Sequence, residues 1–442
     1  MFAEHPMRRE LNDEVHARPP LRIDGPALVL HLACLRPAGD AGGQADLRFI
    51  ADLARHHGAP APNLASRYGI LPRGETQLKW ELHTEFTSYT LVMPRSDLLP
   101  AAVRWADLPE DALQLAKQCP GQCVAALVLE FRAAETAEVN FDMVGQLFPS
   151  GDVVASSVGD DAAEIWTDFR LDATGFGRML LINRSLTAGR AGRMVQRLVE
   201  IETYRLMALL GLALTRQTGG VLSALEGRLK ALIERTAALG STGQSGDGQA
   251  DDSGDRLLLN ELTKLAAETA SLSTTTRYRL SAGTAYAELV ARRLDDIHEG
   301  RVGGLSRLSS FLDRRFTPAM RTCEAFIRRL EQLETGIDRA SDMLRTRVDV
   351  NLQAQNGALL RDMESRSRVQ LRIQEAVEGL SVFAISYYLI GLLKVVAEGL
   401  LPNSMGHAHL LLSAVAVPIV LAAVWIGVKR LRHAIKGHSV KE

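Results

Sequence analysis

The side chains best placed for chemistry lie at the start of, and within, an apolar segment near the C-terminal end of the sequence. They are Glu378, Ser381, Ser386, Tyr387 and Tyr388. A charged or hydroxyl-bearing side chain at membrane depth is costly unless it faces protein or water. If the segment crosses a bilayer, these residues are candidates for lining an ion path. Packing between helices is the competing interpretation, above all for the two tyrosines.

Two further groups could bind a ligand. His407 and His409 form an H-x-H pair just before a second apolar segment, where they could hold a divalent cation at a pore mouth. Simple placement at the membrane interface is the alternative. Near the other end, Glu14, His16 and Arg18 alternate, so an extended chain would present all three on one face. That face could cradle a ligand, or the segment could be an arm tied down by ion pairs.

Other chemistries lack a motif. The sequence contains neither a G-x-x-x-x-G-K-[ST] phosphate loop nor a G-x-G-x-x-G turn after a strand. Cys119 and Cys123 have C-x-x-x-C spacing, but no second pair nearby completes a four-ligand zinc site. No nucleophile, base and orienting group lie close together. We therefore expect no enzyme, and no cofactor is identified beyond a divalent cation at the sites above.

Composition narrows the class of protein. The 442 residues carry 51 basic and 52 acidic side chains, and this balance argues against a nucleic-acid partner, which usually requires a basic excess. With 46% hydrophobic residues, the chain is too apolar to be mostly disordered. Four scattered cysteines suit a reducing cytosol, and we expect no signal peptide at the N terminus.

Two apolar segments predict a membrane hairpin. Residues 379–397 can cross a bilayer if Lys394 snorkels to the interface, and residues 410–428 can cross directly. Basic residues flank the pair on its outer sides, while the loop between is nearly uncharged: Arg366, Arg368 and Arg372 before it, and Lys429, Arg430, Arg432 and Lys436 after it. By the positive-inside rule, both flanks and both termini are cytoplasmic.

The first span continues a long helix. No proline occurs between Ala319 and Leu401, and Thr317–Pro318 is a typical helix start, with Thr as the N-cap. Apolar residues recur at alternating intervals of three and four, as in the seam of a coiled coil, at Cys323, Phe326, Leu330, Leu333, Ile337, Ala340 and Leu344. Such a stripe must be covered, either by helices of the same subunit or by neighbouring subunits around an axis.

The remaining sequence predicts two kinds of structure. Helical spacing over about 190–235 and 257–299 predicts a helical hairpin, and the Gly/Ser-rich tract between them reads as a flexible connector. Before it, strands alternate with helices: the expected strands are 27–35, 77–93, 123–131 and 179–182, and the expected helices are 46–57 and 111–117.

The predicted fold is thus an α+β cytoplasmic domain, long coiled-coil-like helices and a C-terminal transmembrane hairpin. We divide the chain into 1–188 (α+β domain), 189–317 (helical hairpin with a flexible linker at 240–255), 318–378 (stalk helix), 379–397 (first span), 398–409 (outer loop), 410–428 (second span) and 429–442 (basic tail).

Several motifs resemble a bacterial family of membrane-anchored proteins of unknown function. They are H-P-x-R-x-E-L-x-D-E-V-H-A-R-P-P at the N terminus, Arg197–Arg205, Thr276–Ala282 and Val377–Tyr388. The order of elements also resembles, more distantly, the CorA class of divalent-cation channels. That resemblance implies a pentamer around the first span. The Gly-Met-Asn signature of the class is absent, which puts magnesium selectivity in doubt.

These features together predict a homo-oligomeric protein of the bacterial inner membrane. The function we expect is a CorA-like ion channel or transporter, in which a cytoplasmic gating domain controls passive flux along the first span. The alternative is a membrane-anchored scaffold or sensor whose cytoplasmic face recruits a protein partner and whose hairpin conducts nothing.

Overall fold

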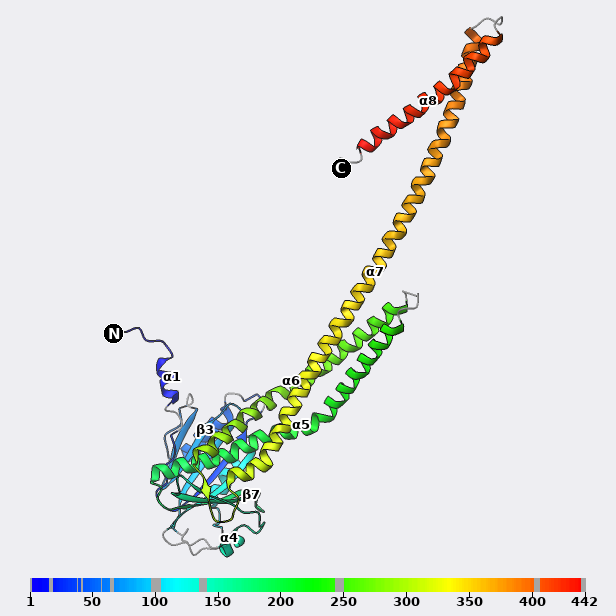
Figure 1. Cartoon of the computed structure of the whole chain (residues 1–442). Coiled ribbons are helices and arrows are strands. Elements are labelled where there is room, and N and C mark those ends of the chain that lie inside the picture. Colours follow the sequence, from blue (N-terminus) through cyan, green and yellow to red (C-terminus); the bar gives the residue numbers. More distant parts are fainter. Residues whose placement is uncertain are drawn as a thin grey trace. The chain divides into compact units, whose positions relative to one another are not determined.

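The computed structural model describes residues 2–15, 19–37, 39–40, 43–56, 58–63, 67–96, 105–134, 141–242, 250–400 and 406–438. The chain divides into two compact units. Unit 1 comprises Met1–Ala237 and Asn260–Ser341, and unit 2 comprises Ala238–Leu259 and Asp342–Glu442. Figure 1 shows the sheet and the helices that pack on it in unit 1.

The elements in chain order are α1 (Arg8–Val15), β1 (Ala27–Leu35), α2 (Gln44–His56), β2 (Tyr68–Arg73), β3 (Thr76–Leu82), β4 (Phe86–Pro94), α3 (Glu110–Gln118), β5 (Gln122–Ala133), α4 (Phe141–Leu147), β6 (Val154–Val158), β7 (Ala163–Leu171), β8 (Gly177–Asn183), α5 (Ala188–Thr242), α6 (Ala250–Asp296), β9 (Gly300–Arg301), α7 (Leu308–Leu400) and α8 (Gly406–His438).

The strands form one sheet in the order β2-β3-β4-β1-β5-β8-β7-β6-β9. The β5–β8 pair is parallel, and the other neighbouring pairs are antiparallel. The N-terminal unit is therefore α+β, as predicted. The single strand expected over 77–93 is instead a hairpin, because the chain turns at residues 83–85 and β3 pairs with β4.

Strand β1 is buried on both faces. Leu28, Leu30 and Leu32 pack into a core with residues of α2 and α3. On the opposite face, Ala33 packs with Met207 of α5. Successive side chains of a strand point to opposite faces, so the nearly continuous apolar run of β1 is what a strand covered on both sides requires.

Helix α7 begins before the predicted start. The Thr317–Pro318 pair lies inside the helix, which starts at Leu308. Proline lacks the N–H group that bonds to the preceding turn, so it normally marks a start or a kink. Here Leu308, Leu312 and Phe316 are buried at intervals of four residues, and their packing stabilises the turns that precede the proline.

The apolar stripe of α7 is covered within the same chain. All of its predicted members from Cys323 to Ala340 are buried in unit 1. Two ion pairs fasten this part of α7 to its neighbours. Arg329 binds Glu226 of α5 through two contacts of 2.9 and 2.6 Å, and Arg277 of α6 lies 3.5 Å from Glu334. For this part of α7, the structure therefore supports cover by helices of the same subunit, rather than by neighbouring subunits.

The described residues of the predicted linker at 240–255 are helical. Helix α5 continues to Thr242 and α6 already begins at Ala250, while residues 243–249 lie outside the described part. Near the start of α6, the buried carboxylate of Asp255 lies 3.0 Å from Nε of Arg347 of α7, and both residues belong to unit 2. Composition predicted a solvated acidic tract and missed this ion pair.

One helix of the described residues is long and apolar enough to cross a membrane: Leu308–Val396 of α7. Its C-terminal part includes the first predicted span. Helix α8 starts at Gly406, so the predicted outer loop is shorter than 398–409, and it continues through the predicted second span to His438.

A close backbone contact at the start of α5 gives a first prediction. The N–H of Ile23 donates to the carbonyl of Ala188 at 3.2 Å, and a Cβ added at Gly192 would collide with the carbonyl oxygen of Leu21. We expect Gly192→Ala to destabilise the protein by about 1–3 kcal/mol, because the backbone must shift. Thermal unfolding followed by tryptophan fluorescence measures this, since Trp80 and Trp166 are buried in unit 1.

Gly219→Ala is the matched control in the same helix. Among the described residues, no atom lies within 4 Å of a Cβ added there. Alanine is a better helix former than glycine, so this variant should be up to about 1 kcal/mol more stable than wild type. Equal melting temperatures for the two variants would contradict the proposed backbone contact.

Candidate functional site: a buried polar network between the sheet and helix α5

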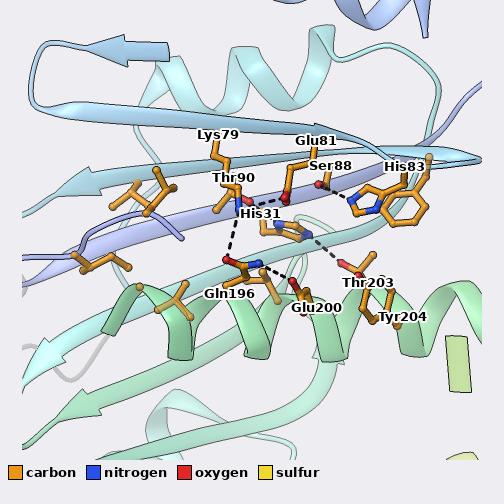
Figure 2. A pocket seen from close by; sticks show the side chains of 17 residues that line it. His31, Lys79, Glu81, His83, Ser88, Thr90, Gln196, Glu200, Thr203 and Tyr204 are labelled. Carbon is orange, nitrogen blue, oxygen red and sulfur yellow. Dashed lines mark hydrogen bonds and ion pairs between the residues drawn. The ribbon is translucent and has the colours of Figure 1, made fainter. Parts of the chain in front are cut away.

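A small polar cavity lies between strands β1, β3 and β4 and helix α5 (Figure 2). The space open to the centres of water molecules is about 30 Å³, enough for one or two waters and too small for a larger ligand. Polar side chains line the cavity from the sheet and from the helix. The sheet side provides His31, Lys79, Glu81, His83, Ser88 and Thr90, and α5 provides Gln196, Glu200, Thr203 and Tyr204.

A chain of polar contacts crosses this cavity. Nζ of Lys79 lies 3.2 Å from Glu81 on the same strand and 3.5 Å from Oε1 of Gln196 on α5. Nε2 of Gln196 donates to Glu200 at 2.8 Å, and Glu200 forms an ion pair with Arg293 of α6. Lys79 and Glu81 are both buried, so they need these partners. The network joins the sheet, α5 and α6.

His31 is a buried member of this lining. One ring nitrogen lies 2.8 Å from the Thr90 hydroxyl and the other 2.9 Å from that of Thr203. Burial, reinforced by the positive charge of Lys79, lowers the pKa of His31 from 6.5 to about 3. The imidazole is therefore neutral at physiological pH, with one nitrogen donating and the other accepting. It fastens α5 to the sheet and carries no charge for catalysis.

The sequence contains a feature that points to this network, although no known motif includes it. His31 interrupts an apolar strand, and Lys79 and Glu81 alternate with Leu78, Trp80 and Leu82. Alternation in a sheet normally means that one face meets water. Here α5 covers the polar face, so the charges are buried. The informative feature is a charged pair on a strand that a long helix must cover, and the sequence alone does not show which face α5 takes.

A second set of polar contacts fixes the start of α7. The buried carboxylate of Glu299 accepts hydrogen bonds from the backbone N–H of Ser309 at 3.3 Å and from the hydroxyl of Ser156 at 3.0 Å. The Ser156 hydroxyl also accepts from the N–H of Leu308 at 3.0 Å. The first N–H groups of a helix lack intrahelical partners and carry partial positive charge, so a carboxylate there stabilises the helix start. Glu299 and Ser156 thereby tie α7 to β6.

The structure places the predicted path residues on different faces of α7. Ser381 and Tyr388, seven residues apart, point in nearly the same direction, and Ser386 lies on the opposite side. Ser386 is only 2% exposed, whereas Tyr387 and Tyr388 are 77% and 72% exposed. Ser381 donates to the carbonyl of Val377 at 2.9 Å. Glu378 is half-buried.

The other predicted site residues are only partly described. His407 and His409 lie in helix α8, but their side chains are outside the described part. Glu14 lies in α1 with its side chain likewise outside it, and His16 and Arg18 are not described at all. Within the described residues, no group of three or more His, Cys, Asp or Glu side chains could hold a metal ion.

A family model described as "Protein of unknown function (DUF3422)" matches residues 3–435. The chain belongs to the DUF3422 family. The motif resemblance to a family of unknown function is thereby confirmed. A comparison with curated proteins finds no match.

One solved structure is similar to this DUF3422 protein: the complete structure of the CorA magnesium transporter from Methanocaldococcus jannaschii. The similarity covers 68% of this chain and 89% of that one, with 12% sequence identity and a TM-score of 0.19. The sequence resemblance to CorA is likewise a distant one. A TM-score of this size assigns neither fold nor function to this chain.

The burial of His31 predicts a pH dependence. The unfolded chain binds more protons than the folded one between pH 6.5 and about 3, so His31 stabilises the fold above this window, and that contribution is lost as the pH falls through it. The slope is about 1.4 kcal/mol per pH unit in the middle of the window. In His31→Gln, an amide that can still donate and accept replaces the titrating ring. At pH 7 we expect the variant to melt below wild type. As the pH falls from 7 to 4.5, wild type loses the His31 contribution, so the difference between the two melting temperatures should shrink.

The control is His56→Gln, which changes an exposed histidine of α2. It gives the effect of replacing a histidine by glutamine at a surface position. A difference between wild type and His31→Gln that stays constant from pH 7 to 4.5 would mean that the ring is not protonated on unfolding in this range.

Proposed function

We propose that this DUF3422 protein is a homo-oligomeric membrane protein that passes ions passively, with unit 1 as its cytoplasmic gating domain. In this proposal α7 and α8 form a two-span hairpin in the bacterial inner membrane with both termini in the cytoplasm. The basic residues on both flanks of the hairpin support that orientation. Ion binding or release between cytoplasmic domains would move α7, which carries the change into the membrane.

The main support for this proposal is that α7 is one continuous helix. Its first turn is fixed to β6 through Glu299, its next turns are buried in unit 1, and the same unbroken helix contains the candidate span. A helix is stiff along its axis, so a shift imposed on the buried part reaches the apolar part. A linker between a sensor domain and a membrane anchor would not require this continuity.

Exposed apolar side chains on the α7 stalk support an oligomer. Val369, Ile373, Val377 and Leu380 recur at intervals of four, four and three residues, which puts them on one helix face, and all are more than half exposed. Leu359, in the stalk ahead of them, is 66% exposed. A stripe of this kind is covered in a stable protein. We propose that second copies of the same helix cover it around a common axis.

The opposite faces of the span divide the candidate residues into two roles. Ser386, and Val420 of α8, are buried among mostly exposed neighbours, which supports packing of α8 against this face of α7. The exposed face with Ser381 and Tyr388 then remains for an axial path. A hydroxyl on that face can replace part of the hydration shell of an ion.

A membrane-anchored scaffold is the second candidate function. The feature in its favour is an open groove of about 890 Å³ beside α6, whose lining includes Thr274, Arg277, Tyr278 and Ser281. The Tyr278 ring is 60% exposed there, and an exposed aromatic beside a cation is a typical anchor for a protein partner. In the scaffold, the hairpin serves only as an anchor.

The first test is the mass and symmetry of the full-length protein in nanodiscs, from particle images. We expect a closed ring in which the α7 helices converge on the axis. A monomer or a simple dimer has no axial path and would refute the channel. A ring that passes none of magnesium, zinc, cobalt or potassium in liposomes would favour the scaffold, and Tyr278→Ala would then be the variant with which to test partner binding.

The second test separates the two faces of the span. Ser381→Leu should lower flux in liposomes at least tenfold while the ring stays intact, because an apolar side chain replaces the hydroxyl. Ser381→Ala, which keeps the site small, should lower flux less. Ser386→Leu adds volume at a buried position, so it should reduce the yield of assembled rings. Unchanged flux in Ser381→Leu would exclude this face as the path.

A further inference from the structure

Three of the four cysteines converge at one corner of unit 1. Cys34 lies near the end of β1, Cys119 caps the C terminus of α3, and Cys123 lies at the start of β5. Sγ of Cys34 is 3.4 Å from Sγ of Cys119, and Cys34 is paired directly with Cys123 across the sheet. All three are free thiols. Their separation in sequence, 85 residues between Cys34 and Cys119, hid this cluster from spacing arguments.

The backbone fixes this arrangement. Leu35 pairs with Gln122, next to the Cys34–Cys123 pair. Between α3 and β5 the chain turns at Gly121, whose φ of +89° suits glycine. A Cβ at Gly121 would collide with the carbonyl oxygen of Leu35, so the turn lies directly against the end of β1. Cys119 is thereby held beside Cys34.

The two closest thiols are unequal. Cys34 is buried and Cys119 is partly exposed. Hydrogen bonding to Cys34 lowers the pKa of the Cys119 thiol and also that of Cys123, and it raises the pKa of Cys34. Of the two thiols with a lowered pKa, Cys119 is the one whose Sγ lies 3.4 Å from Sγ of Cys34, so it is the thiolate in contact with Cys34. A thiolate that solvent can reach is the form that reacts with peroxides. The fourth cysteine, Cys323, is buried in α7, and burial raises its pKa.

We propose that Cys34 and Cys119 form a reversible disulfide when the protein meets hydrogen peroxide. The Cys119 thiolate attacks one peroxide oxygen, so that an S–O bond forms, the O–O bond breaks and the departing hydroxide takes up a proton. The Cys34 sulfur then attacks the Cys119 sulfur, and hydroxide leaves with the Cys34 proton as water. Two thiols are oxidised by two electrons in all, and one peroxide becomes two waters. A dithiol reductant reverses the reaction.

The geometry favours the Cys34–Cys119 bond over the two alternatives. Its sulfurs are already in contact and need to approach by less than the width of an atom to reach the bond length of about 2.05 Å. The Cys123 thiol instead points its hydrogen at the carbonyl of Ala125, 3.2 Å away. Among the described residues, no group of three or more His, Cys, Asp or Glu side chains at this corner could hold a metal ion. The disulfide would clamp the end of α3 to β1.

The test uses the reduced full-length protein in detergent, treated with hydrogen peroxide and mapped by mass spectrometry without reductant. We expect one Cys34–Cys119 cross-linked peptide, about 2 Da lighter than the sum of its parts, which dithiothreitol reverses. Wild-type protein alone decides the pairing, so no variant has to fold. A Cys34–Cys123 link, or Cys119 oxidised to sulfinic acid with no link, would overturn the proposal.

Variants then assign the roles. Cys119→Ser should abolish the link, whereas Cys123→Ser and Cys323→Ser should form it at the wild-type rate. Oxidation should raise the melting temperature of wild type and of Cys123→Ser, but not that of Cys119→Ser. Loss of the link in Cys123→Ser would overturn the assignment of Cys119 as the reacting sulfur. The readout is independent of ion flux, so it stands or falls separately from the proposed channel.

Discussion

The constraint on which unit 1 depends is that strand β1 has no face toward water. Every polar group that it carries must find a partner inside the protein. Its two faces meet different surroundings. His31 points toward α5, where burial keeps it neutral and Thr203 contacts its ring, and Cys34 points toward the core of α2 and α3, where it meets Cys119. The polar network and the thiol cluster are thus two consequences of one doubly covered strand.

The helix packing that buries the sheet also joins the sheet to the long helices. Helix α5 buries the polar face of β3 and passes the contact on to Arg293 of α6 through Glu200. On the other side of the domain, Glu299 and Ser156 hold the start of α7 at β6. Removing one partner of a buried charged pair is far more costly than removing a surface pair. The sheet therefore fixes the unit 1 parts of the long helices α5, α6 and α7 through polar contacts as well as apolar packing.

Much of this architecture could be predicted because it follows from local pattern. Strand β1 and the α7 stripe from Cys323 to Ala340 are apolar at the spacing that burial requires, and they were found at those residues. The early start of α7 could not be predicted, because packing of Leu308 and Leu312 outweighs the local preference of Pro318. The network around Lys79 and the thiol cluster depend on contacts between distant residues, which spacing along the chain does not encode.

The contacts that hold α7 in unit 1 differ in strength, and this difference affects how the helix could move. Arg329–Glu226 and Arg277–Glu334 are partly exposed, so solvent and salt screen them and they hold α7 only weakly. The buried stripe resists separation of α7 from the helices that cover it. Glu299 fixes the first turn against β6. If α7 transmits a signal as proposed, its motion is therefore a pivot about that turn, with the exposed ion pairs exchanging partners as the stripe shifts.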